Sequence, residues 1–378
     1  MDFNFSEQQK MLQAMARDFL AKECLTTRIR ELQTSDAGYD PQTWRKIANL
    51  GWLGLVFPEE YGGANSEFMD MVSLVEEMGR NIVPGPFFST IVLCALPIAE
   101  FGTSAQKTEF LPPITRGNKL WTFAMAESSA RYKASEIRTS ATVQGEAFSI
   151  NGDKIFVTDA HVADYFLLAA RTSELGSTEN GITLFVVDAK SHGIQIEIMP
   201  TIAGDRQFHV TFRNVKVPSE RILGTVDKGW AIIDFIFQRA TILKSAEMAG
   251  ACDAVLEMTN TYAKDRIQFD KPIGSFQAIQ HKLADMLIDV EGLRYLVYEA
   301  AWLMSIGAPC NLQISVTKAK ANEVYEHTCI NGIKIHGAIG FTMDHDIGLY
   351  FRNIKAAEYF LGDTDSHLEK VADAIGLK

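Results

Sequence analysis

The sequence lacks several features that would point directly to a function. Its five cysteines, among 378 residues, form no CxxC pair and no cluster with histidine at metal-ligand spacing. No run approaches the roughly 18 apolar residues that a bilayer span needs. Positive charge is in the minority, because 36 Lys and Arg stand against 47 Asp and Glu, for a net charge of −11. These absences argue against a metal site, a membrane span and nonspecific nucleic-acid binding.

The N-terminal residues do not resemble a targeting segment. Residues 1–18 mix acids with apolar side chains at helical spacing, namely Phe5, Met11, Met15 and, just beyond, Phe19. A secretory h-region would be continuously apolar, and a transit peptide would be rich in Arg and poor in acids. With scattered cysteines as well, we expect a cytoplasmic protein in a reducing compartment.

Composition and periodicity predict a globular α+β protein. Hydrophobic residues make up 47% and charged residues 22%, which suits a large core. Apolar spacing is helical from Ser6 to about Lys119, changes to period two from Trp121 to about Val217, and is helical again after Gly224. We therefore expect an N-terminal helical domain (1–119), a middle antiparallel β domain (120–224) and a C-terminal four-helix bundle (225–378).

Particular residues carry these patterns. Apolar residues alternate in three predicted strands, which are Ile182-Leu184-Val186, Ile194-Ile196-Ile198 and Phe208-Val210-Phe212. Two helical stripes follow, one of Met248, Ala251, Cys252, Val255, Thr259 and Tyr262 and one of Ile279, Leu283, Met286, Val290 and Leu293.

No GxSxG elbow, Walker loop or GxGxxG is present, and the informative segments are of another kind. They are GWLGL at 51–55, PEEYGG at 58–63, YAKDRIQFDKPI at 262–273, FQAIQ at 276–280 and HGAIGFT at 336–342. The residues, order and spacing of these segments resemble those of the acyl-CoA dehydrogenase family over almost the whole chain.

The resemblance implies FAD bound between subunits and an acyl-CoA thioester that loses a proton from Cα and a hydride from Cβ. It also implies an electron-transfer flavoprotein as acceptor and a role in fatty acid or steroid degradation. Either a homotetramer or a heterotetramer with a related subunit would fit.

The same resemblance assigns cofactor contacts in the C-terminal region. Arg266 stands where the family places an arginine on the FAD pyrophosphate, and a guanidinium suits that group. Phe269 would pack on the cofactor, with Asp270 replacing the usual glycine, and Gln277 would reach the adenosine half from a neighbouring subunit. The alternatives are a solvated helix-end cation and an ordinary surface glutamine.

Further FAD contacts are implied near two turns. Gly337 and Ala338 would allow close approach of the backbone, while Lys334 would meet a phosphate or remain a surface lysine. Asp363 and Asp365 occupy positions that approach FAD in the family.

In the β domain, Met125 and Ala126 would offer backbone N–H groups to the pyrimidine edge of the flavin. Phe156 replaces a common tryptophan beside the ring, and Thr158 would lie near N5. The alternative for these residues is ordinary packing within a strand. The loop 128–135 has no glycine where relatives are rich in it, so Arg131 and Lys133 are either phosphate contacts or solvated charges.

The catalytic base is the largest departure from the family. The two positions at which the family places its glutamate correspond here to Leu361 and Ala240, and neither side chain takes a proton. Asp363 is the nearest acid to the first position, and is either an unusual base or a helix-start residue. Glu247 lies two turns beyond the second and is expected to be structural. The Leu361 backbone N–H still suits polarisation of a thioester carbonyl.

Three hypotheses follow from this departure. The chain is a subunit of a heteromeric dehydrogenase whose partner supplies the base, or a self-sufficient dehydrogenase that uses an acid such as Asp363. The third possibility is a non-catalytic binding subunit or a flavin enzyme of different chemistry on the same fold.

Overall fold

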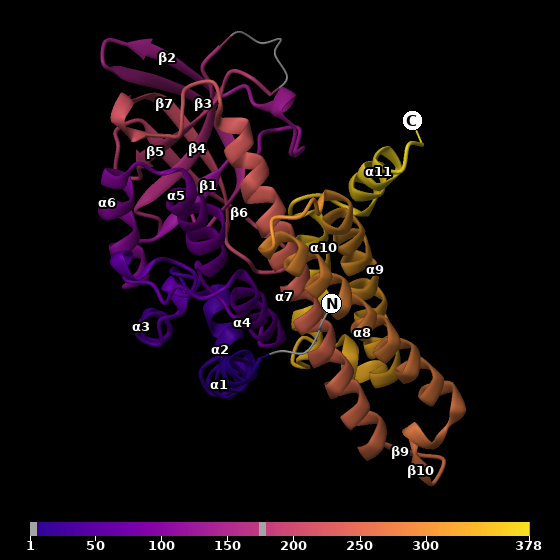
Figure 1. Ribbon diagram of the computed structural model, residues 1–378. Coiled ribbons are helices and arrows are strands. Elements are labelled where there is room, and N and C mark those ends of the chain that lie inside the picture. Colours follow the sequence, from indigo (N-terminus) through magenta and orange to yellow (C-terminus); the bar gives the residue numbers. More distant parts are fainter. Residues whose placement is uncertain (1–5, 174–178, 378) are drawn as a thin grey trace. The chain divides into compact units, whose positions relative to one another are not determined.

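The computed structural model describes residues 6–173 and 179–377, which fall into two compact units. The helical unit comprises Met1–Ile29, Glu67–Val83 and Thr241–Lys378, and the sheet unit comprises Arg30–Ser66 and Pro84–Ala240. Helical regions flank a region of strands along the chain, which confirms the α+β class (Figure 1). The units cut across the three expected segments, so the boundaries at 119 and 224 stay predictions.

One mixed sheet forms the centre of the sheet unit. Its strands are β1 (Trp121–Ala124), β2 (Ser140–Gln144), β3 (Ala147–Thr158), β4 (Tyr165–Arg171), β5 (Ile182–Asp188), β6 (Ile194–Met199), β7 (Gln207–Pro218) and β8 (Ile222–Leu223). They follow the order β6-β7-β3-β2-β4-β5-β8, with β1 beside β4. Most neighbours are antiparallel, as expected, but β1 and β2 pair with β4 in parallel. The β2–β3 hairpin lies within the crossover between β1 and β4 that a parallel pair requires.

Burial in the strands follows the predicted alternation only in part. In β7, Phe208, Val210 and Phe212 are buried while the residues between them are not, as predicted. In β5 the predicted set Ile182, Leu184 and Val186 is buried, and so are the residues between them, so this strand is covered on both faces. The sequence of a strand that is covered on both faces is typically a continuous run of apolar residues.

Several helices accompany the sheet. They are α2 (Thr26–Thr34), whose first residues belong to the helical unit, α3 (Pro41–Asn49), η3 (Phe88–Ala95), α5 (Leu96–Phe101) and α6 (Ser104–Thr115). A capping box between Thr103 and Gln106 starts α6. The Gln106 amide also donates to the carbonyl oxygens of Glu220 and Ile222 at 3.0 and 2.8 Å, which fixes α6 beside the end of the sheet.

The helical unit is a bundle of long helices. They are α1 (Glu7–Glu23), α4 (Phe68–Arg80), the C-terminal part of α7 (Gly229–Asp265), α8 (Gln277–Ser305), α9 (Asn311–His336), α10 (Ile347–Tyr359) and α11 (Thr364–Ala374). The predicted stripe on α7 is confirmed, because Met248, Cys252 and Val255 are buried. Within the described residues no helix combines the length and apolarity that crossing a membrane requires.

The helical spacing noted near the N-terminus corresponds to α1. Met11 and Met15 are exposed and Phe19 is half-buried, while the helix buries Ala16 and Leu20. Phe5 lies outside the described residues. The buried face of α1 is therefore formed partly by a small residue, Ala16, rather than by the largest apolar side chains.

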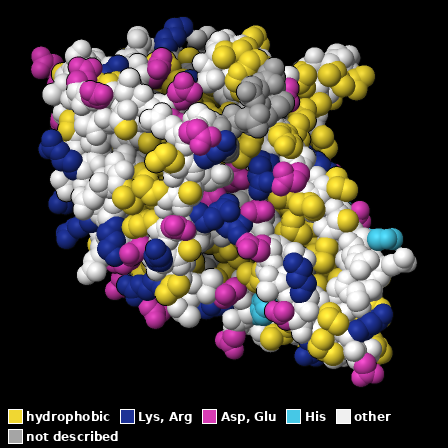
Figure 2. Space-filling model, turned by 60° about the horizontal axis from the view of Figure 1, so that its bottom comes forward, with side chains coloured by type: hydrophobic (Ala, Val, Ile, Leu, Met, Phe, Trp, Pro, Cys, Tyr) yellow, Lys and Arg dark blue, Asp and Glu magenta, His cyan; other side chains and the backbone are white. Residues whose placement is uncertain are grey.

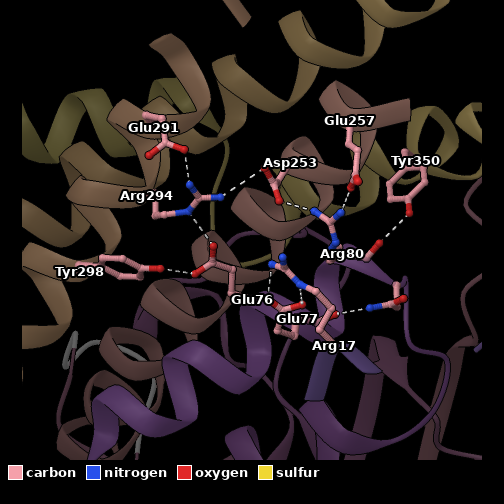
Figure 3. A network of polar contacts seen from close by, with 11 residues as sticks. Arg17, Glu76, Glu77, Arg80, Asp253, Glu257, Glu291, Arg294, Tyr298 and Tyr350 are labelled. Carbon is pink, nitrogen blue, oxygen red and sulfur yellow. Dashed lines mark hydrogen bonds and ion pairs between the residues drawn. The ribbon is translucent and has the colours of Figure 1, made fainter. Parts of the chain in front are cut away.

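A polar network joins α1, α4, α7, α8 and α10 within the helical unit (Figure 3). Its labelled members are Arg17, Arg80, Arg294, Glu76, Glu77, Asp253, Glu257, Glu291, Tyr298 and Tyr350. Glu76 is only 4% exposed, and it accepts hydrogen bonds from Arg294 Nε at 2.8 Å and from Tyr298 Oη at 2.6 Å. Burial raises the pKa of Glu76, whereas these two donors lower it and so stabilise the charged carboxylate in the core.

The helical unit also exposes many large apolar side chains. Figure 2 shows hydrophobic side chains interleaved with charges of both signs on the face presented. Those exposed in this unit include Leu287, Ile288, Phe341, Met343, Phe351, Tyr359 and Leu368.

Candidate active site

The sheet unit brings four predicted flavin contacts together where β1 and β3 end. Met125 and Ala126 directly follow β1, and Phe156 and Thr158 lie in the last residues of β3. The Ile155 N–H donates to the Ala126 carbonyl at 2.9 Å, which joins the two strand ends. The Thr122 hydroxyl donates to the Thr158 carbonyl at 2.5 Å, so the end of β3 is also tied to β1.

A β-bulge turns Phe156 outward. The pairing of β3 with β7 shifts register between Lys154 and Val157, and Phe156 has a φ of +53°. A bulky residue rarely adopts this left-handed region, and such residues cluster at functional sites. Phe156 is 44% exposed although its neighbour Val157 is fully buried, so an aromatic face is presented at the surface of the unit.

A buried ion pair that sequence reasoning missed supports this strand end. Lys154 is inaccessible to solvent, and its ammonium donates to Glu127 Oε1 at 2.7 Å and to the Met125 carbonyl at 3.0 Å. Glu127 also accepts from the backbone N–H groups of Arg138 and Thr139. Although burial acts in the opposite direction, Lys154 and these N–H groups lower the pKa of Glu127. The only signal in the sequence was one lysine within a strand of core residues.

Asp159, next to Thr158, has a carboxyl group whose charged form is disfavoured by burial. Burial, together with the nearby charge of Asp205, raises its pKa to about 6, although the Ser89 hydroxyl donates to its Oδ2 at 2.8 Å. Its φ is +58°, a conformation that asparagine also tolerates. Because the folded chain binds this proton more tightly than the unfolded chain, the residue's contribution to stability is lost as pH rises through 6.

Asp159→Asn is therefore expected to stabilise the protein in a pH-dependent way. The gain in thermal denaturation temperature over wild type should be small at pH 4.5 and reach a few degrees at pH 8, because the amide cannot ionise. Thermal melts across this range measure it. Asp188→Asn, at an exposed position, serves as the control. An advantage for Asp159→Asn that does not grow with pH would contradict the assignment.

The glycine-free loop after Glu127 is anchored at its far end. Arg131 and Lys133 are exposed, as either expectation for them allows. Tyr132 packs edge-on against Phe237 with 5.6 Å between ring centroids. The Arg171 guanidinium donates to the Ala134 carbonyl at 2.6 Å, so the loop returns to the sheet at a fixed point.

In the helical unit, Arg266 begins a two-stranded hairpin. β9 (Ile267–Gln268) pairs with β10 (Lys271–Pro272), and the turn residues Phe269 and Asp270 both have positive φ, at +54° and +64°. This geometry is typical of a type I′ turn, in which aspartate is an accepted substitute for glycine. Arg266 is exposed, and Phe269 is 85% exposed with an edge-on contact to Phe276.

Gln277 and the turn after α9 lie near the same end of the bundle. Gln277 is the exposed first residue of α8, directly after the hairpin. His336, at the end of α9, stacks on Tyr262 of α7 with 4.4 Å between centroids. Since Tyr262 lies one helical turn before Arg266, the stacking places the 336–338 turn close to the hairpin.

This turn is open to a ligand. Gly337 has a φ of +67°, and a Cβ added to it would meet no atom within 4 Å. Ala338 and Lys334 are exposed. By contrast, the His336 ring is buried and its Nδ1 lies 2.8 Å from the Gly332 carbonyl, so it is a packing residue.

Leu361 occupies an unusual turn between α10 and α11. The residue is 6% exposed and has a φ of +65°, and Gly362 follows at +115°. His367 Nε2 donates to the Leu361 carbonyl at 3.1 Å. Within the described part of the chain the Leu361 N–H makes no hydrogen bond, although both neighbouring N–H groups do. A donor left free in a nearly buried turn is suited to an external acceptor.

The acids near this turn are engaged in structural contacts. Asp363 is the N-cap of α11, where its Oδ1 accepts from the Ser366 N–H at 2.9 Å, and this contact lowers the pKa of Asp363. Its assignment as a base gains no support from this geometry and remains a prediction. Asp365, in the first turn of α11, is exposed.

The second family position for a base also carries no acid. Ala240 is fully buried within α7. Glu247 is paired with Lys244 at 2.8 Å on the same helix, which agrees with the expected structural role. Lys244 in turn lies over the Phe360 ring, 5.2 Å from its centroid.

The residues in each unit suit the groups of FAD that the family resemblance assigns to them. The exposed Arg266 guanidinium has no carboxylate partner in the described chain, and Gly337 leaves room for a diphosphate against the backbone. In the sheet unit, the outward-facing Phe156 beside the end of β1 suits a flat ring. The exposure of Arg266, Phe269 and Gln277 in a single chain agrees with a site that a neighbouring protomer completes.

Comparison with known proteins identifies the chain's relatives. Three family models match, described as the N-terminal domain (residues 6–118), the middle domain (122–215) and the C-terminal domain (227–376) of acyl-CoA dehydrogenase. A short-chain specific acyl-CoA dehydrogenase from Megasphaera elsdenii is 32% identical over 99% of this chain and 100% of its own length.

Two further relatives belong to complexes. Subunit CarC of the caffeyl-CoA reductase-Etf complex from Acetobacterium woodii is 31% identical over 95% of both chains. A chain in the structure of the ChsE4-ChsE5 complex from Mycobacterium tuberculosis superposes with a TM-score of 0.90 at 27% identity, covering 100% of both chains. The chain therefore belongs to the acyl-CoA dehydrogenase family, a family of flavoprotein oxidoreductases that act on CH–CH bonds.

Proposed function

We propose that this chain is one subunit of a heteromeric, FAD-dependent acyl-CoA dehydrogenase whose related partner supplies the catalytic carboxylate. The observation that carries the proposal is the turn at Leu361. The position of the family base holds an apolar side chain, yet its backbone N–H is free and the turn around it is fixed. Binding of the thioester is retained in this chain, while proton abstraction is not.

Each group of residues has a distinct task in this proposal. The Leu361 N–H donates to the thioester carbonyl and so stabilises negative charge on its oxygen when Cα loses its proton. FAD, when bound, accepts the hydride from Cβ. Met125 and Ala126 would hold the pyrimidine edge of its ring, Phe156 would pack beside the ring and Thr158 would lie near N5.

The remaining contacts hold the other half of the cofactor. Arg266 would neutralise the pyrophosphate, Phe269 would pack on the cofactor, and Gln277 would reach the adenosine half from a neighbouring subunit. Lys334, Gly337 and Ala338 would line the approach to the phosphates, and Asp363 and Asp365 would approach the cofactor from the turn before α11. These assignments rest on the family motif and on the exposure and openness described above.

The assembly follows from the same observations. Exposed apolar side chains on the helical unit favour association, and relatives occur in the CarC-Etf and ChsE4-ChsE5 complexes. We therefore expect a tetramer, with an electron-transfer flavoprotein as the acceptor. The five cysteines are all buried, and their scattered positions in the sequence agree with the reducing compartment expected of a cytoplasmic location.

Two other functions remain to be separated from this one. A self-sufficient enzyme would use Asp363, which its N-cap contacts disfavour because they hold the carboxylate in place. A non-catalytic subunit, or a flavin enzyme with different chemistry, would keep FAD but leave an added acyl-CoA unchanged in every assembly.

A mixing experiment tests the proposal. The chain is purified alone and together with a homologous chain that carries the missing glutamate, and bleaching of the flavin spectrum by acyl-CoA is measured without an electron acceptor. We expect bleaching only in the mixture, and Glu→Gln in the partner should abolish it. Bleaching by this chain alone, lost in Asp363→Asn but kept in the matched variant Glu247→Gln, would support the self-sufficient enzyme instead. If the purified protein is colourless, the assignment of FAD as its cofactor is refuted.

A further inference from the structure

Lys318, on α9, is a buried lysine that no assigned function explains. The residue is inaccessible to solvent, and its ammonium has no carboxylate partner in the described chain. Its acceptors are Asn322 Oδ1 at 2.6 Å and three backbone carbonyl oxygens, those of Ala357 and Glu358 at 3.0 Å and of Gly362 at 3.3 Å. Burying an ammonium costs several kcal/mol, so a lysine at this place needs a reason.

The acceptors show what the ammonium holds. Ala357 and Glu358 belong to the last turn of α10, where unpaired carbonyls carry the negative end of the helix dipole. Gly362 lies beyond the helix, in the turn that leads to α11. Lys318 therefore caps α10 from another helix and at the same time ties the turn to that helix end.

His367 contacts the same turn and holds a second carbonyl oxygen, that of Leu361. Its Nε2 donates to the Leu361 carbonyl, and the same atom would lie 2.9 Å from a Cβ placed on Gly362. The carbonyls of Leu361 and Gly362 are thus held by His367 and Lys318 respectively. Within the described residues the Leu361 N–H makes no hydrogen bond, and of the other N–H groups of this turn only that of Asp363 is likewise without one.

We propose that Lys318, assisted by His367, is a positioning residue that holds the Leu361 N–H in place for the carbonyl oxygen of an acyl thioester. The inference rests on the proposed function of that N–H and adds the group that orients it. A leucine in the left-handed region is strained by about 1–2 kcal/mol, so the turn would relax if its carbonyls were released. Relaxation would rotate the adjoining peptide and move the donor away from its acceptor.

The test compares two ligands that differ only in the carbonyl group. Dissociation constants are measured by calorimetry for an acyl-CoA and for the S-alkyl-CoA thioether with the same carbon chain. Both ligands carry the same carbon chain. Its length, between butyryl and palmitoyl, is chosen as the one whose acyl-CoA wild type binds most tightly. The protein is flavin-loaded and in the assembly that the mixing experiment defines.

Lys318→Met is expected to weaken thioester binding at least tenfold and to leave thioether binding within twofold. FAD content should not change. The matched control is Lys320→Met on the same helix, whose lysine forms only partly exposed ion pairs with Glu323 and Asp289, and both ligands should bind it as they bind wild type. Lys318→Gln, which keeps two amide donors, should restore part of the discrimination and serves in place of Lys318→Met if the latter does not fold.

Two outcomes would overturn parts of the account separately. Equal weakening of both ligands in the Lys318 variants would show a merely structural lysine and refute the positioning role. A wild-type protein that binds thioester and thioether equally would instead refute the Leu361 N–H as a carbonyl donor, and with it the proposed function of the turn.

Discussion

Replacing Gly79 or Gly250 with alanine is expected to prevent folding of the helical unit or to lower its denaturation temperature by at least about 6 °C. The two glycines lie where α4 meets α7. A Cβ on Gly79 would stand 1.9 Å from the Glu247 carbonyl oxygen, and one on Gly250 would stand 1.8 Å from the Glu76 carbonyl oxygen. Because both obstacles are helix backbone, no side-chain rotation relieves them and the helices themselves must move apart.

The consequence extends beyond the clash itself. Arg80 of α4 also contacts the Asp253 carboxylate of α7, so separating the two helices loosens this ion pair of the polar network as well. Thermal melts of purified variants measure the effect. The matched control is Gly292→Ala on α8, where a Cβ meets nothing within 4 Å, and alanine should be neutral or stabilise by up to about 1 kcal/mol. Similar denaturation temperatures for Gly79→Ala and Gly292→Ala would contradict the close crossing.

The features that the sequence predicted well are those encoded by local pattern. Alternation identified β7, and helical spacing identified the buried face of α7 through Met248, Cys252 and Val255. The two segments that the resemblance grouped, at Met125-Ala126 and Phe156–Thr158, lie at adjoining strand ends, while their contacts with a flavin stay a prediction. Residues that share one element or one family motif can be grouped from the sequence because their spacing alone sets their direction.

The features that the sequence did not reveal depend on partners far along the chain. Lys318 meets carbonyls 39 to 44 residues away, and Lys154 meets Glu127 at a separation of 27. Apart from the apolar strand around Lys154, the local pattern does not distinguish these lysines from solvated ones, because only the tertiary fold supplies their acceptors. The same reason applies to Gly79. Only glycine fits at this position, because the backbone of another helix lies where a side chain would begin.

The polar network shows how charge can be placed in the core of an acidic protein. Arg294 contacts Glu76 and Glu291 and lies 3.4 Å from Asp253, so one guanidinium is shared among three carboxylates. Although burial acts to lower it, these carboxylates raise the pKa of Arg294. Arginine suits this role because its planar fork donates in several directions and stays charged. Removing it leaves the negative charges without their common partner.

Arg294→Met is accordingly expected to cost about 3–5 kcal/mol, because it leaves Glu76 buried with only the Tyr298 hydroxyl. The loss should be greater at pH 8 than at pH 5. Without the guanidinium the pKa of Glu76, already raised by burial, rises further, and stability falls as pH increases through it. Denaturant unfolding at both pH values measures the difference.

The double variant Glu76→Gln/Arg294→Met separates loss of packing from loss of charge compensation. The glutamine carbonyl still accepts from Tyr298 and carries no charge, so most of the stability should return and the pH dependence should disappear. Lys355→Met provides the exposed counterpart, since Lys355 forms its ion pairs with Glu326 and Glu358 while half exposed, and little change is expected. If the double variant is no more stable than Arg294→Met, Arg294 acts mainly through the packing of its side chain rather than as the counter-charge of Glu76.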